Sequence, residues 1–323
     1  MTGRPGDAVR VRGVGKQFDL VDAVHDIDFA VPAGAVTALV GPTGAGKSTV
    51  LRIVLGLQQP TAGSVDIDVP GTGPGAVGAV LSPRGLHPAR TVHDHLRCYA
   101  PLAGASRRRV DAVLEETGLA AIADTVVAQL QPGQETRLAL ATALLADPPL
   151  LVLDDPFTGA DGYERGWLHD LLRRHVGRGG TVLVSSDKLA DVVSTADQLV
   201  VLSEGAVVWQ GTPAKLRRGH PDRLVVAASP SIALATALAA QGFTDAVMRP
   251  DGRLAVAEAS ESTIRAVAEA AQVRIGSIVT DPIHPDRVLA SLTKPRRHRY
   301  SPPVPPANPA AFAPAPTSYG MPR

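Results

Sequence analysis

Cysteine, net charge and long apolar runs are what this sequence has least of. Its 323 residues include one cysteine, Cys98, so no internal disulfide can form and a reducing compartment is indicated. The formal net charge is only +1, which argues against a surface that binds nucleic acid. The N-terminal residues MTGRPGDAVR lack the apolar segment of a secretory signal.

One uncharged stretch, residues 224–244, has nominally the length needed to cross a membrane. It is rich in alanine, however, and Ser229-Pro230-Ser231 and Gln241-Gly242 interrupt it. We therefore predict a short strand followed by a helix that begins at the Ser-Pro pair and ends at Gly242. If the protein works at a membrane, another chain must supply the crossing.

What the chain does have is enough apolar sequence for an ordinary core, with 45% hydrophobic and 20% charged residues. Within residues 1–219, apolar runs at 35–40, 150–153 and 181–184 alternate with longer periodic segments. This alternation predicts an α/β domain with a mostly parallel sheet. Between about 86 and 130 the pattern becomes helical and more charged, which indicates an inserted helical subdomain.

The character of the sequence changes at residue 220. Residues 220–293 predict a small α+β domain in βαββαβ order, a ferredoxin-like arrangement. Its expected elements are strands at 223–227, 245–248, 253–257 and 273–279 and helices at 232–241, 260–271 and 286–292. Residues 294–323 begin with KPRRHR, and 8 of the last 23 residues are proline. That composition predicts a disordered tail.

The segment GPTGAGKST follows an apolar run and precedes a helical pattern, so it matches the phosphate-binding loop of nucleoside triphosphatases. Glycines let backbone amides curl around phosphate oxygens, and the next helix directs its positive end at the same anion. The predicted ATP-binding residues are Gly41, Pro42, Thr43, Gly44, Ala45, Gly46, Lys47, Ser48 and Thr49. Lys47 is expected to neutralise the β- and γ-phosphates, and Ser48 to ligate Mg²⁺.

A second acidic element is expected at the end of a buried strand, and residues 150–155 (LLVLDD) supply it. We predict that Asp154 holds Mg²⁺ and that Asp155 lies beside the γ-phosphate. The alternative, that the two aspartates only cap the next helix, is weakened by the phosphate loop upstream.

These motifs, in this order, resemble the ATP-binding subunits of ABC transporters, especially exporters whose membrane part is a separate chain. The resemblance runs from about Val9 to Gly211 and more loosely to Thr293. It implies a P-loop NTPase fold, ATP and Mg²⁺ as ligands, and an adenine-stacking role for Phe18. Asp161 in TGAD matches the family's aspartate loop, which faces the partner subunit.

The departures from the family pattern all concern hydrolysis. The glutamine expected near Ser82 is missing, and the LSGGQ signature is LQPGQ, in which Gln131, Gly133 and Gln134 would face the partner's ATP. Asp155 replaces the catalytic glutamate and Asp187 replaces the switch histidine. Hydrolysis is therefore expected to be weak or absent without a partner, because misplacing a reacting group by about 1 Å can cost ~10²-fold in rate.

The resemblance further implies two partners, a transmembrane permease chain and a second nucleotide-binding subunit, and a peripheral position on the cytoplasmic face of the membrane. Because a homodimer would carry every departure twice, the sequence favours a heterodimer. A second reading stays open: an ATP-sensing protein that binds nucleotide without driving transport. A kinase or GTPase is disfavoured by the missing Asn-Lys-x-Asp segment, and a zinc site at His87, His93 and His95 by the lack of further ligands.

Overall fold

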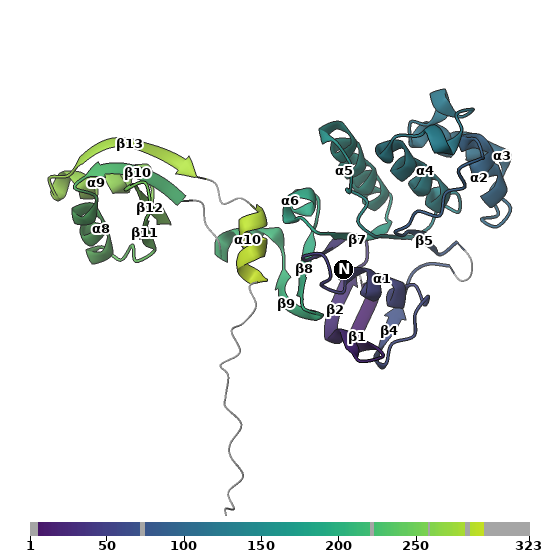
Figure 1. Cartoon of the computed structure of the whole chain (residues 1–323), viewed down its shortest axis with the longest axis horizontal. Coiled ribbons are helices and arrows are strands. Elements are labelled where there is room, and N and C mark those ends of the chain that lie inside the picture. The colour runs from purple at the N-terminus through teal and green to yellow at the C-terminus, as the bar shows by residue number, and fades with distance from the viewer. Residues whose placement is uncertain (1–5, 72–74, 220–222, 258, 282–284, 294–323) are drawn as a thin grey trace, which may run out of the picture. The chain divides into compact units, whose positions relative to one another are not determined.

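The computed structural model describes residues 6–71, 75–219, 223–257, 259–281 and 285–293, and Figure 1 shows the arrangement of its elements. The predicted C-terminal tail lies outside these residues. The central element is a six-stranded sheet with the order β5-β6-β7-β3-β8-β9. Its strands are β3 (Val36–Val40), β5 (Val77–Val80), β6 (Leu150–Leu153), β7 (Thr181–Ser186), β8 (Gln198–Ser203) and β9 (Ala206–Gly211). All neighbouring pairs are parallel except β8 and β9, as the apolar runs predict.

This sheet is buried on both faces because its side chains alternate between two apolar clusters. In β6, Leu151 and Leu153 join one cluster, while Leu150 and Val152 join the other. Residues of β3, β7 and β8 divide between the two clusters in the same way. The continuous apolar runs in the sequence are therefore those of strands covered from two sides.

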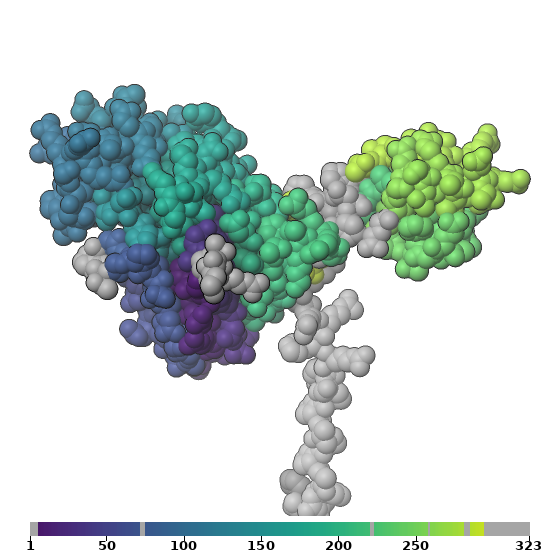
Figure 2. All heavy atoms as spheres, turned by 180° about the vertical axis from the view of Figure 1, so that it is seen from behind, coloured from purple at the N-terminus to yellow at the C-terminus, as the bar shows by residue number. Residues whose placement is uncertain are grey.

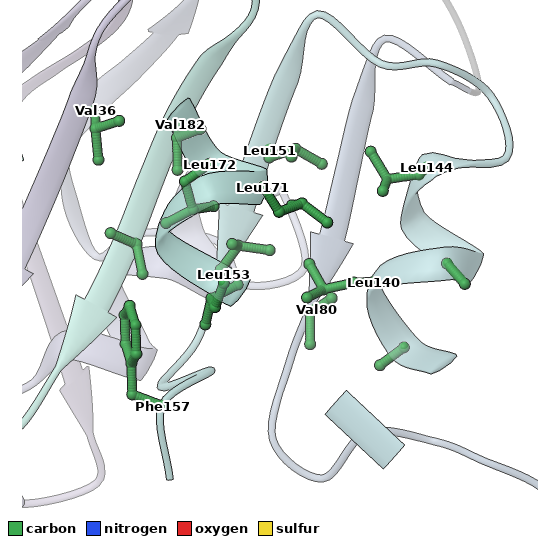
Figure 3. Close-up of a cluster of buried hydrophobic side chains, with 14 of the residues drawn as sticks. Val36, Val80, Leu140, Leu144, Leu151, Leu153, Phe157, Leu171, Leu172 and Val182 are labelled. Atoms are coloured by element: carbon green, nitrogen blue, oxygen red, sulfur yellow. The ribbon is translucent and has the colours of Figure 1, made fainter. Parts of the chain in front are cut away.

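The first cluster packs the sheet against α4 (Pro132–Leu144) and α5 (Gly162–Gly177). Figure 3 shows leucines of α4 (Leu140 and Leu144) and α5 (Leu171 and Leu172) gathered in one cluster with Val80 of β5 and Leu151 and Leu153 of β6. This face also holds α6 (Leu189–Val192) and α7 (Pro213–Gly219), through Leu189 and Leu216.

The second cluster packs the other face against α1 (Lys47–Val54) and an antiparallel sheet. That sheet has the order β2-β1-β4 and consists of β1 (Asp7–Phe18), β2 (Val21–Pro32) and β4 (Ala62–Ile67). Val50 and Leu51 of α1 and Ile27 of β2 are each fully buried here. The helix that carries the lysine of the phosphate loop is thus fixed between two sheets.

The stretch between β5 and β6 is helical, as its pattern indicates. It contains α2 (Val92–Tyr99), α3 (Arg107–Glu116) and the short 3₁₀ helices η1 (Ala120–Ile122) and η2 (Val127–Gln129), and leads into α4. Ser106 caps α3 by accepting a hydrogen bond from the Arg109 amide, at 3.2 Å. Val110, Val113 and Leu114 of α3 pack into the first apolar cluster.

The C-terminal elements form a four-stranded antiparallel sheet with the order β11-β12-β10-β13. They are β10 (Arg223–Ser229), α8 (Ser231–Ala240), β11 (Ala246–Met248), β12 (Leu254–Ala257), α9 (Glu261–Ala270) and β13 (Arg274–Asp281). In order of appearance the strands lie 2-3-1-4, which is the ferredoxin-like topology. Figure 2 shows their atoms, from green to yellow-green, as one compact group.

The last described helix, α10 (Pro285–Leu292), packs differently from the sequence-based expectation. We predicted this segment as part of the small α+β domain. Instead, Val288 and Leu289 belong to the apolar cluster of the six-stranded sheet, and α10 contacts α6. The Ser203 hydroxyl also donates a hydrogen bond to the Thr293 carbonyl at 3.3 Å. The physical reason is the amphipathic face of α10, whose buried residues match the apolar surface of α6.

The uncharged stretch 224–244 folds as β10 and α8, as predicted. None of the helices that the structure describes is both long and apolar enough to cross a bilayer.

Candidate functional site

Three neighbouring strands end at the same edge of the six-stranded sheet. β6, β7 and β3 are adjacent and parallel, so their carboxyl ends lie side by side. The loop after β3 leads to Lys47, β6 is followed by Asp154 and Asp155, and β7 by Asp187. In open α/β sheets this edge is where ligands bind.

The loop between β3 and α1 admits only glycine at two of its positions. At Gly41, an added Cβ would lie 2.3 Å from the Leu202 carbonyl oxygen. At Gly46, which has φ 95°, a Cβ would lie 2.5 Å from the Val24 side chain. Both distances are too short for a Cβ atom. The backbone can approach these neighbours so closely only because both residues are glycine.

Lys47 is the first residue of α1, and its ammonium group is folded back onto the loop. It donates hydrogen bonds to the carbonyl oxygens of Gly41, at 2.7 Å, and Pro42, at 3.0 Å. Burial lowers the pKa of Lys47, and the nearby carboxylates of Asp155, Asp187 and Asp154 oppose that shift. A partly desolvated cation at a helix N-terminus is a strong site for phosphate.

Ser48, Asp154 and Ser185 form a buried hydrogen-bonded group. The hydroxyls of Ser48 and Ser185 both donate to Asp154 Oδ1, at 3.0 and 2.8 Å. The second oxygen, Asp154 Oδ2, is buried and has no hydrogen-bond partner among the described residues. Because an unpaired buried carboxylate oxygen is costly, this atom is suited to a cation or its water shell, with Ser48 as neighbouring ligand.

Asp155 is held in an unusual conformation beside this group. Its φ is 47°, in the left-handed region, and its amide donates to the Ser185 hydroxyl at 2.9 Å. Its Oδ2 accepts a hydrogen bond from Thr158, and its Oδ1 is buried without a partner within the described part of the chain. Burial raises the pKa of Asp155, an effect that the Thr158 hydrogen bond opposes and the Asp187 charge reinforces.

These groups border a hollow of about 540 Å³. The predicted residues that line it are Thr43, Gly44, Gly46, Lys47, Ser48, Thr49, Asp155 and Asp187. Gly41, Pro42, Ala45 and Asp154 lie behind this lining, where the Gly41 and Pro42 carbonyls hold Lys47, Asp154 holds Ser48 and Ala45 is buried in the second apolar cluster.

Some lining residues carry no sequence motif. Val21, Asp22 and Ala23 come from the start of β2, and Glu204 and Gly205 from the turn between β8 and β9. Both turn residues have positive φ, which suits a tight hairpin. The only local signal was the Glu-Gly pair, which indicates a turn but not its place beside the phosphate loop.

Phe18 ends β1, three residues before Val21, and 40% of its surface is exposed. It does not line the hollow, and its ring lies 5.1 Å from the Lys16 ammonium. Its predicted contact with adenine stays a prediction.

The LQPGQ segment begins α4 and does not border this hollow. The amide of Gln131 donates to Gln134 Oε1 at 2.9 Å, which closes the first turn of the helix. A Cβ at Gly133 would lie 2.8 Å from Glu164 Cγ in α5. Glu164 in turn pairs with Arg137 at 2.9 Å, so the starts of α4 and α5 are held together.

Comparison with known proteins finds similarity to ATP-binding proteins of transport systems. The family model for "ABC transporter" matches residues 24–158. The chain is 36% identical to the Nod factor export ATP-binding protein I of Bradyrhizobium diazoefficiens, over 66% of this chain and 73% of that protein. It is 37% identical to the sulfate/thiosulfate import ATP-binding protein CysA of Mycolicibacterium paratuberculosis, over 67% of this chain and 62% of that protein. A solved ATP-binding subunit of an ABC transporter superposes with a TM-score of 0.59 at 28% identity, covering 66% of this chain and 92% of the other.

Proposed function

Because the chain belongs to the ATP-binding subunits of ABC transporters, we propose that it binds Mg·ATP tightly but hydrolyses it poorly, and drives an export permease as one half of a heterodimer. One observation carries the proposal. The phosphate cradle is complete, whereas two carboxylates, Asp155 and Asp187, occupy the positions that the family resemblance gives to a glutamate and a histidine.

The cradle fits ATP and its metal ion. The loop amides between Gly41 and Thr49 would surround the phosphates, with Lys47 as their counter-charge. Ser48 and the unpaired Oδ2 of Asp154 would hold Mg²⁺ and its water shell. The metal ion, when bound, neutralises charge that develops on the phosphate oxygens. Two of the three donors of the Lys47 ammonium are held by the carbonyls of Gly41 and Pro42, so the third can meet a phosphate oxygen.

The hydrolytic positions fit their task less well. Asp155 is one methylene shorter than glutamate, and its Oδ2 is engaged by Thr158. A general base must reach the attacking water closely, and a misplacement of about 1 Å can cost ~10²-fold in rate. Asp187 lines the same hollow as Lys47 and acts on its charge. Its carboxylate is negative, like the phosphates that would bind there. Together these changes would raise the barrier by about 3–6 kcal/mol.

A heterodimer accommodates these properties better than a homodimer. In a head-to-tail pair each ATP lies between one subunit's phosphate loop and the other's signature, and a homodimer would repeat the poor site twice. The LQPGQ segment still begins a well-formed helix, whose N-terminus can face a partner's nucleotide. Pro132 contributes no amide donor, so this contact would rest on Gly133, Gln134 and the helix dipole.

The direction of transport is proposed from the relatives and the small C-terminal domain. The named relatives include both an exporter and an importer, and the resemblance of the small C-terminal domain, residues 220–293, to that of the exporter group favours export. The permease would be a separate chain, and the protein would lie peripherally on the cytoplasmic face of the membrane.

The test is binding and turnover measured separately on the full chain. We expect Mg·ATP to bind by calorimetry, Lys47→Ala to weaken binding by about tenfold or more, and the matched surface change Lys215→Ala to leave it unchanged. Single-turnover hydrolysis should be about 10² to 10⁴-fold slower than in an intact ABC ATPase. Failure to bind Mg·ATP would refute the cradle, and fast turnover of the chain alone would refute the proposed defect.

The second candidate, an ATP sensor without a transport role, rests on the same two carboxylates. Copurification of the tagged chain from its native membrane distinguishes the two functions. A permease and a second ATP-binding chain in the complex support the transporter, whereas nucleotide binding without a membrane partner supports the sensor.

A further inference from the structure

A second hollow of about 540 Å³ lies far from any nucleotide-binding residue in sequence, within the ferredoxin-like sheet. It forms where three segments meet: the end of β10, the turn before β12 and the start of β13. Its polar lining includes Arg253, Arg274, Ser229 and Asp251, and its floor includes Ala227 and Gly276. We call it the Arg274 hollow.

The position of these residues on the sheet follows from strand alternation. Leu254, Ala228 and Ile275 pack with the apolar cluster that includes α8 and α9. Their neighbours Arg253, Ala227, Ser229 and Arg274 therefore project from the opposite, helix-free face. In Figure 1 both helices lie on one side of this sheet. The pairing registers place Arg274 opposite Ser229 of the central strand and Leu254 opposite Val226, so the two arginines flank β10 from its two sides.

The hollow exists because the residues between the arginines are small. Ala227 has only a methyl group, and Gly276 has no side chain. Gly276 also lies at a bulge, because Ala227 pairs with Ser277 and Ala228 with Ile275, which leaves Gly276 without a partner in the register. A Cβ at Gly276 would lie 3.6 Å from the Ala227 carbonyl oxygen and 3.9 Å from its Cβ, so Gly276 lies directly beside Ala227. Bulges of this kind often adjoin binding sites because they redirect side chains.

The charges in the hollow do not cancel. Asp251 is paired with Arg253, whose guanidinium approaches to 2.7 Å and whose amide donates to Asp251 Oδ1 at 3.1 Å. The Arg274 side chain makes no hydrogen bond or ion pair with any residue that the structure describes. One guanidinium fork is therefore left to face the hollow, and this group matches a carboxylate or phosphate in geometry and charge.

We propose that the Arg274 hollow binds a small organic anion, a molecule with one carboxylate or phosphate monoester group and a short body, with Arg274 as its counter-ion and Ala227 and Gly276 beneath it. The volume lies within the range of small-molecule sites, which is about 300–1,000 Å³. Ser229 and the bulged backbone supply further polar groups to orient the ligand. The proposal is independent of the nucleotide site, since the two hollows share no residue.

The experiment titrates the full-length protein with propionate and, separately, glycerol 3-phosphate, up to about 10 mM, a range that detects millimolar affinity. Amide chemical shifts are followed by NMR, with sodium chloride at equal ionic strength as the reference. We expect one of the two anions to shift amides of Ala227–Ser229 and Arg274–Gly276. The arm that responds identifies the anion as carboxylate or phosphate.

Three variants separate a built site from general attraction of anions. Arg274→Gln should weaken binding by about tenfold or more, and Ala227→Leu should abolish it by filling the floor. Arg265→Gln removes the same charge from α9, where Arg265 pairs with Glu261, and should leave binding intact. Well-dispersed amide resonances of residues 223–281 in the absence of anion show that each variant keeps this sheet folded.

Two results would overturn the proposal. Equal weakening by Arg265→Gln and Arg274→Gln would mean that only the overall charge matters. Binding of an acidic peptide at Arg274, with no response to either small anion, would make the hollow a protein-docking surface instead.

Discussion

Replacing Gly46 by alanine tests whether the phosphate loop is shaped by steric necessity. Gly46 and Gly44 lie in the same loop and both have positive φ, 95° and 84°. They differ in their surroundings. A Cβ at Gly46 would lie 2.5 Å from Val24 Cγ1 and 2.9 Å from the Ala23 carbonyl oxygen, whereas a Cβ at Gly44 would meet nothing within 4 Å. Gly44→Ala is therefore a matched control for backbone strain.

The expected loss of folding stability has two contributions, the left-handed backbone conformation and the steric overlap of the new Cβ. A left-handed conformation costs a non-glycine residue about 1–2 kcal/mol, and both variants incur this cost. Overpacking a tight site adds about 1–3 kcal/mol, which applies only to Gly46→Ala, because Val24 is buried and fixed in β2. We expect a loss of about 1–2 kcal/mol for Gly44→Ala and about 2–5 kcal/mol for Gly46→Ala.

Urea denaturation without nucleotide measures this difference. Both tryptophans, Trp167 in α5 and Trp209 in β9, lie in the part of the chain that contains the loop, so their fluorescence reports its unfolding. With a slope of about 2 kcal/mol per molar urea, Gly46→Ala should unfold at roughly 0.5–1.5 M less urea than Gly44→Ala. Equal midpoints for the two variants would refute the steric argument.

Three further predictions concern other parts of the molecule. Asp155→Glu combined with Asp187→His should raise single-turnover hydrolysis by about tenfold or more, and the rate should fall again when Lys47→Ala is added; an unchanged rate would mean that other positions limit hydrolysis. Asp155→Asn should stabilise the protein at pH 7. Because burial raises the pKa of Asp155 in the folded state, its carboxyl favours folding fully below the unfolded pKa of about 3.9, and this contribution is lost as the pH rises through the folded pKa. In urea denaturation the gain from the substitution should therefore be present at pH 7 and vanish near pH 4, and an equal gain at both pH values would contradict a raised pKa of Asp155. Leu289→Ala should cost about 2–3 kcal/mol and speed hydrogen exchange in α10 and α6, whereas exposed Arg287→Ala should change neither, and protection unaffected by Leu289→Ala would show that α10 does not depend on this contact.

The predictable part of the site is the part that is contiguous in sequence. Residues 41–49 carry their own geometry, because a strand, a glycine turn and a helix follow one another without tertiary help. Asp154 and Asp155 were found because the buried strand before them is an unmistakable apolar run. Ser185 was missed, since its role is to bridge Asp154 and the Asp155 amide across two strands, and no local pattern encodes a contact between chain segments.

Two histidines show that burial, too, is hard to predict from the sequence. Polarity alone predicts that His95 and His175 are exposed, but only 1% and 4% of their surfaces are accessible. His95 follows Val92 by three residues and precedes Leu96, so it lies on the buried face of α2, where its ring is 4.9 Å from that of Tyr99. Burial lowers the pKa of both histidines. Helical periodicity places His95 on that face together with Val92 and Leu96, whereas residue type alone does not.

The secondary structure of the small C-terminal sheet was predictable because each element is short and bounded by turn residues. The fate of α10 was not, because an amphipathic helix shows which face it buries but not against what. The chain passes through α7, forms the ferredoxin-like sheet, and then packs α10 against α6. The helix that α10 contacts, α6, begins two residues after Asp187 of the candidate site.

In the function we propose, nucleotide binding and hydrolysis depend on different elements of the molecule, so hydrolysis can be impaired while binding stays intact. The loop between β3 and α1 is fixed by backbone approaches to Leu202 and Ala23 that tolerate no side chain. The positions proposed for hydrolysis, Asp155 and Asp187, follow β6 and β7 and are not part of the loop between β3 and α1. We therefore expect a substitution at either aspartate to change the charge and reach of groups around the γ-phosphate, and the charge that acts on Lys47, rather than the backbone of the glycine loop. In the proposed heterodimer, such a subunit would still close on ATP with its partner, and the partner's catalytic residues would set the rate at which the pair reopens.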